Sequence, residues 1–150
     1  MGDFATAVAL VCAAVNLLAG GVGAWHWWQV TTSRAFWPLA RLGQAVAVVL
    51  AGLAAVLALT GADPDSGLFW LYAVLPVAVS LIAEQLRIAS AQTVLDARDL
   101  EDAQAVGRLP EDEQRSVVLA IVRREMGVAT AAALVICFLA LRAAMETGGL

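Results

Sequence analysis

Residues 36–60 read FWPLARLGQAVAVVLAGLAAVLALT, and Arg41 is the one charged residue among them. An α-helix rises about 1.5 Å per residue, so a helix of this length covers the roughly 30 Å hydrocarbon core of a bilayer. Residues 5–25, 68–87 and 127–145 have the same apolar character. We therefore predict four membrane-spanning helices.

The composition of the whole chain agrees with this prediction. Hydrophobic residues make up 61% of the sequence and charged residues 15%, with a mean hydropathy of +0.81. Soluble domains carry about 45–50% apolar and about 25% charged residues. The sequence thus predicts an all-α polytopic membrane protein in which residues 1–150 form a single four-helix bundle. The lipid bilayer is therefore the first partner that we expect for this protein.

The third connection, residues 88–126, differs from the other two. The first two connections are short and polar, and they imply tight antiparallel hairpins. In the third, apolar residues continue at helical spacing beyond residue 88, Gly107 and Pro110 interrupt them, and the spacing resumes from Val117. We predict an extended helical hairpin continuous with spans three and four, with Pro110 as the first residue of its second arm. Its apolar stripe either joins the two arms or docks a partner.

The arginines predict the orientation, because Lys and Arg are retained on the cytoplasmic side of a membrane. Arg34 flanks the first connection, and the second connection has no basic residue. The third connection holds or adjoins Arg87, Arg98, Arg108, Arg115, Arg123 and Arg124. We expect the first and third connections in the cytoplasm and both termini outside.

The sequence contains no recognisable catalytic or metal-binding motif. Cys12 and Cys137 lie inside apolar runs, where cysteine usually serves as a small buried hydrophobe. There is no nucleophile elbow, no glycine-rich phosphate loop and no metal-ligand spacing. The arginines are interspersed with acids, which disfavours nucleic-acid binding. We predict no catalytic residue, no metal, no cofactor and no nucleic-acid partner, and an enzyme is the least expected class.

Polar residues within the spans are the candidate site. Asn16 lies near the middle of span one, where its amide should bond to a neighbouring helix. A polar layer is expected near the cytoplasmic boundary, with members from all four spans: His26, Arg41, Gln44, Glu84, Arg87, Arg124 and Glu125. Glu84 with Arg41 and Glu125 with Arg87 are charge-compatible pairs between helices.

Three interpretations of this layer stay open. Intramembrane charges usually pair with one another or face water. The layer is therefore either an ion-paired girdle that sets the register of the helices, or a vestibule for an ion, a proton or a small solute. The third interpretation is a site for an anionic lipid headgroup or phosphate built from Arg41, Arg87, Arg123 and Arg124. His26 is the one histidine, and among interfacial tryptophans it fits an anchoring role.

Spans one and two each carry a stripe of small residues, which let helix backbones approach closely. In span one the stripe is Ala5, Ala9, Cys12, Asn16 and Gly20, and in span two it is Ala40, Gly43, Ala47, Ala51, Ala54 and Ala58. These faces pack either inside one bundle or between protomers, so a homo-oligomer is one arrangement that the sequence allows.

Three segments carry a resemblance to a known group. Residues 71–76 (LYAVLP), 83–89 (AEQLRIA) and 123–127 (RREMG) are similar to a pattern in small, uncharacterised four-span membrane proteins of high-GC Gram-positive bacteria. The resemblance implies a bacterial inner-membrane location and a defining role for the polar layer. No activity is attached to the group, so no catalytic role is implied.

Two classes of function follow from the sequence. The first is a non-catalytic accessory or scaffold protein that acts through helix packing and the cytoplasmic hairpin, with a partner in a membrane complex. The alternative is a small oligomeric channel or transporter that uses the polar layer. The sequence favours the first class, because a permeation pathway usually needs polar residues through the whole membrane thickness.

Overall fold

In the computed structural model, which describes residues 2–148, the chain is helical and the described residues form no strand. The helices are α1 (Gly2–Trp28), α2 (Phe36–Leu59), α3 (Leu68–Asp96), α4 (Ala103–Gly107) and α5 (Glu111–Met145). Four of them, α1, α2, α3 and α5, are long and apolar enough to cross a membrane. The prediction of four long apolar helices is thereby confirmed, and such helices are typical of a multi-pass membrane protein.

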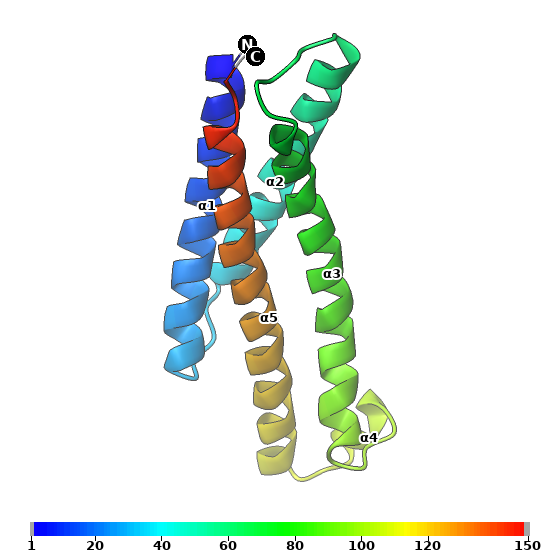
Figure 1. Ribbon diagram of the computed structural model, residues 1–150. Helices are drawn as coiled ribbons and strands as arrows, with labels where there is room; N and C mark the ends of the chain where they lie inside the picture. Colours follow the sequence, from blue (N-terminus) through cyan, green and yellow to red (C-terminus); the bar gives the residue numbers. More distant parts are fainter. Residues whose placement is uncertain (1, 149–150) are drawn as a thin grey trace.

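The four long helices form an elongated bundle (Figure 1). Going around it, α1 packs on α2, α2 on α3, α3 on α5, and α5 again on α1. The two chain ends lie together at one end of the bundle, and α4 lies at the other end (Figure 1). Helices α3 and α5 are longer than their predicted spans, since α3 continues to Asp96 and α5 already begins at Glu111.

Both stripes of small residues face the interior of the bundle. All five stripe residues of α1 are buried, and so are Gly43, Ala47 and Ala54 of α2. Ala40 and Ala51 are half-buried, and Ala58 is exposed. Close packing within one chain therefore accounts for most of the pattern. Large apolar side chains such as Leu18 and Val48 point outwards, as expected for helices that face lipid.

The extensions of α3 and α5 are joined by an apolar cluster. Val94, Leu95 and Val117 are its buried members, and Leu100, Val106, Leu109, Ala120 and Ile121 pack against them. Part of the apolar stripe of residues 88–126 thus lies between the two arms, whereas Ile88 and Val118 are exposed. Helix α4 was not predicted; it begins after Asp102, whose Oδ1 accepts a hydrogen bond from the backbone N–H of Ala105 (2.7 Å).

Pro110 lies one position outside the helix that we expected it to begin. Its ψ of 149° is extended, and Glu111 is the first helical residue of α5. Its carbonyl accepts the hydrogen bond from the N–H of Gln114, so Pro110 occupies the capping position. The first turn of α5 contains three acidic residues, Glu111, Asp112 and Glu113. Their negative charges interact favourably with the positive end of the helix dipole.

Three helices end with a residue in the left-handed conformation, and one of these residues is strained. The residues are Val30 (φ 54°), Gly61 (φ 76°) and Asp99 (φ 55°). At the end of α1 the N–H of Thr31 bonds to the carbonyl of His26 (3.0 Å), which is the Schellman pattern. Glycine and aspartate tolerate this conformation, whereas a β-branched residue rarely adopts it.

We expect Val30→Gly to stabilise the protein. A left-handed residue with a Cβ costs about 1–2 kcal/mol, and the extra freedom of glycine in the unfolded chain offsets part of the gain, which leaves about 0.5–1 kcal/mol. Thermal unfolding in detergent measures the change. Gly61→Val is the reverse control, because no atom lies within 4 Å of the added Cβ and the backbone strain acts alone. A lower melting temperature for Val30→Gly would contradict this explanation.

Candidate functional site

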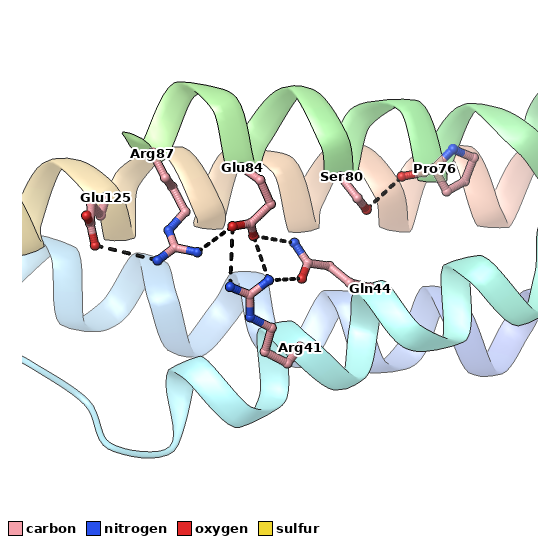
Figure 2. A network of polar contacts seen from close by, with 7 residues as sticks. All are labelled: Arg41, Gln44, Pro76, Ser80, Glu84, Arg87 and Glu125. Atoms are coloured by element: carbon pink, nitrogen blue, oxygen red, sulfur yellow. Dashed lines mark hydrogen bonds and ion pairs between the residues drawn. The ribbon is translucent and has the colours of Figure 1, made fainter. Parts of the chain in front are cut away.

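Glu84 of α3 is the centre of a polar network between α2 and α3 (Figure 2). Its Oε1 accepts hydrogen bonds from Nη1 of Arg41 (2.8 Å) and from Nε2 of Gln44 (2.9 Å). Its Oε2 accepts one from Nη1 of Arg87 (2.8 Å), three residues further along the same helix. Residues three apart lie on one helical face, which is why Glu84 and Arg87 meet.

The network reaches a third helix through Arg87. Its Nη2 lies 3.7 Å from Oε2 of Glu125 on α5. Arg41 also donates from Nη1 to Oε1 of Gln44 (2.8 Å), which orients the amide towards Glu84. The two ion pairs predicted between helices are therefore both present. The polar network, as we use the term below, consists of Arg41, Gln44, Glu84, Arg87 and Glu125.

The charges of the polar network balance, since two arginines face two carboxylates. The guanidinium of Arg87 also stacks on the ring of Trp37, with 4.5 Å between Cζ and the ring centroid. The side chain of Arg87 is 20% exposed, so both the cation–π contact and the ion pairs act in a partly desolvated setting. Trp37 was not among the residues predicted for the polar layer.

The polar network is open towards the outside of the bundle. The side chain of Arg41 is 57% exposed and that of Glu84 is 32% exposed, so the pair lies at the outer face of α2 and α3. One turn towards the N-terminus of α3, Ser80 donates a hydrogen bond to the carbonyl of Pro76 in the same helix (2.8 Å), as Figure 2 shows. The ion pairs of the polar network therefore end at Glu84 and do not continue to Ser80.

Asn16 makes the interhelical bond that its position predicted. The side chain is 1% exposed, and its Nδ2 donates to the carbonyl of Cys12 (2.9 Å) and to that of Gly43 on α2 (3.3 Å). Gly43 permits this approach, because a Cβ at that position would lie 2.6 Å from Oδ1 of Asn16. The amide thus connects α1 to α2 where the two backbones are close.

Gly43→Ala should lower the free energy of unfolding by about 1–3 kcal/mol, the usual cost of overpacking, because the new methyl group displaces the Asn16 amide. Gly52→Ala is the matched control on α2, since no atom lies within 4 Å of its added Cβ. It should be neutral or slightly stabilising through its higher helix propensity. Thermal unfolding of the two variants measures the difference, and equal melting temperatures would refute the assigned contact.

A small cavity lies where the polar network meets Asn16. Its walls come from all four long helices and include Asn16, Gln44, Glu84, Arg87 and several alanines. The space open to the centre of a water molecule is about 20 Å³. A single water needs at least about 10–15 Å³ by this measure, so the cavity has room for one water and is not a passage.

The structure separates two predicted members from the polar layer. Nδ1 of His26 lies 2.8 Å from Oγ1 of Thr31 in the first connection, and Arg124 is exposed. Neither side chain belongs to the polar network. Of the predicted residues of α1, the structure brings Asn16 and not His26 next to the polar network.

The four arginines of the predicted phosphate or lipid site differ in their contacts within the chain. Arg41 and Arg87 are bound to carboxylates, and the guanidinium of Arg123 lies over the ring of Trp27, with 5.5 Å between Cζ and the ring centroid. Three of the four arginines of the proposed phosphate or lipid site thus have other contacts. Within residues 2–148, no three His, Cys, Asp or Glu side chains are grouped as metal ligands would be.

Comparison with known proteins gives no match. No family model fits the sequence, and neither a curated protein nor a solved structure is significantly similar to it.

Proposed function

We propose that the protein is a non-catalytic accessory or scaffold component of a membrane complex. The observation that carries this proposal is the mutual pairing of the charges in the polar network. Arg41 and Arg87 share Glu84, and Arg87 also faces Glu125. Charges that satisfy one another stabilise helix packing and do not need a substrate. The cavity beside them has room for one water only.

The surface for a partner is the helical hairpin of residues 88–126. We place it in the cytoplasm of a bacterial cell, with both termini outside, because the arginines are concentrated in and beside it. Its tip bears seven exposed carboxylates: Asp96, Asp99, Glu101, Asp102, Glu111, Asp112 and Glu113. A partner with a basic surface complements this charge. The apolar cluster between the arms supports the tip.

Chemical cross-linking in native membranes, followed by identification of the linked proteins, tests the proposal. The variant carries Glu101→Gln, Asp112→Asn and Glu113→Gln together, because these exposed carboxylates form no ion pair within the described residues. The matched control carries Asp63→Asn and Asp65→Asn at the opposite end of the bundle. We expect the variant, and not the control, to lose a specific cross-linked partner. The same cross-links in wild type and variant would contradict the proposal.

The second candidate is a small oligomeric channel or transporter, and the exposure of the Arg41–Glu84 pair favours it. More than half of the Arg41 side chain and about a third of Glu84 face outwards from α2 and α3. In a ring of copies, this face would line a shared axis.

Flux measurements in proteoliposomes distinguish the two candidates. A channel requires that the wild type conducts an ion or protons above protein-free liposomes, and that Glu84→Gln and Arg41→Ala change that flux. The scaffold proposal predicts the background rate for all three proteins. A flux that depends on Glu84 would replace the scaffold by the channel.

A further inference from the structure

The small cavity beside the polar network has walls that fit one particular occupant. Helix α5 contributes only Ile136 and three alanines, Ala129, Ala132 and Ala133, and these short side chains leave the space open. The other three long helices contribute the polar groups, which are the amides of Asn16 and Gln44 and the charged ends of Glu84 and Arg87. A small space between apolar and polar walls calls for an occupant that forms hydrogen bonds.

One hydrogen-bonding atom of these walls is left without a protein partner. Asn16 uses its Nδ2 for two carbonyls, whereas its Oδ1 accepts no hydrogen bond from any described residue. A buried acceptor without a donor costs about 1–3 kcal/mol, so an occupant that donates a hydrogen bond to Oδ1 is favoured.

Charge and size limit what this occupant can be. An anion would face the carboxylate of Glu84, and a cation would face the guanidinium of Arg87, so neither ion gains a net attraction. The space of about 20 Å³ accommodates one water and no larger solute. A buried water typically makes about three hydrogen bonds, both as donor and as acceptor.

We propose that the cavity holds one ordered water molecule. It donates hydrogen bonds to Oδ1 of Asn16 and to the carboxylate of Glu84. This water extends the polar network to α1, so that all four long helices share one set of hydrogen bonds and ion pairs. Asn16 thereby acts as a positioning residue for Glu84, in addition to its direct bond to Gly43.

A structure of the wild-type protein in lipid, at a resolution that shows ordered water, tests this proposal directly. We expect one isolated density in the cavity, within hydrogen-bonding distance of Asn16 and Glu84. An empty cavity would overturn the proposal, and so would density with the coordination of an ion. Ala133→Val, which fills the space from α5, should remove the density.

A double-mutant cycle gives a second measurement that does not depend on resolution. No direct bond joins Asn16 to Glu84, so a bridging water predicts that Asn16→Ala and Glu84→Gln together lower the melting temperature by less than the sum of the two single losses. The same cycle in the Ala133→Val background should be additive. Asn16→Ala with Glu146→Gln is the distant control pair and should be additive as well. Additive losses for Asn16 and Glu84 in the wild-type background would refute the bridge.

Discussion

Glu84→Ala should lower the free energy of unfolding by about 2–3 kcal/mol. The change removes the acceptor that Arg41, Gln44 and Arg87 share, and it leaves Arg87 with Glu125 at 3.7 Å as its one remaining carboxylate. Loss of one partner from a fully buried ion pair costs about 3–5 kcal/mol. The 57% exposure of Arg41 lowers the expected cost, because solvent or lipid headgroups stabilise its charge after the change.

Thermal unfolding in detergent, monitored by circular dichroism, measures this loss of stability. Gln85→Ala is the matched control, since Gln85 is the next residue on α3 and is exposed. It should change stability by less than about 0.5 kcal/mol, as surface substitutions usually do. Glu84→Gln keeps the size of the side chain and should fall between the two. Equal stability of the Glu84→Ala and Gln85→Ala proteins would show that the polar network does not hold the helices.

Gly23→Ala should destabilise the protein by about 2–3 kcal/mol, near the upper end of the usual cost of overpacking. Gly23 lies where α1 meets α5 and the start of α2. A Cβ at this position would overlap Oγ1 of Thr130 and lie 2.5 Å from Cε2 of Phe36. Phe36 is completely buried, so its ring has little room to move.

Gly21→Ala provides the control for Gly23→Ala on the same helix. No atom lies within 4 Å of a Cβ added to Gly21, which faces outwards. This substitution should be neutral or stabilising by up to about 1 kcal/mol, because alanine has the higher helix propensity. The two variants therefore differ in packing and not in helix propensity. A Gly23→Ala protein as stable as the Gly21→Ala protein would contradict the packing of α1 against α5.

The sequence predicted the four long helices because each carries an apolar run of membrane length. It also indicated helix beyond residue 87, where apolar residues keep their spacing. Helix α4 (Ala103–Gly107) escaped prediction, because five residues are too few for a periodic pattern. It depends on the Asp102 cap and on Val106, which packs against the apolar cluster of the two arms. The helix thus depends on one local cap and on the packing of Val106 against residues of α3 and α5.

The candidate site could be predicted only in part. Counting residues along a helix gives the depth of a side chain, and depth with charge was sufficient to pair Arg41 with Glu84. Depth does not give the direction around the helix axis, which turns by about 100° per residue. Glu125 points to Arg87, whereas its neighbour Arg124 is exposed. For the same reason, the stacking of Arg87 on Trp37 could not be predicted from the sequence.

Asn16 and His26 show a second reason why the site differs from the expectation. Both lie on α1, and no pattern in the sequence indicates how that helix packs against the others. The structure brings Asn16 to the cavity beside Glu84, and it binds His26 to Thr31 in the following connection. Gly43 accounts for the position of Asn16, because its lack of a side chain lets α1 and α2 approach closely at this point.

The side of the membrane on which residues 88–126 lie is the most direct test of our account. In a protein with Cys12→Ala and Cys137→Ala, single cysteines are placed at two exposed acids, Asp63→Cys and Glu101→Cys. Intact cells are then treated with a membrane-impermeant maleimide. We predict that Asp63→Cys is labelled at once and that Glu101→Cys is labelled only after permeabilisation. The opposite pattern, or labelling of both cysteines in intact cells, would contradict a cytoplasmic hairpin joined to four membrane-spanning helices.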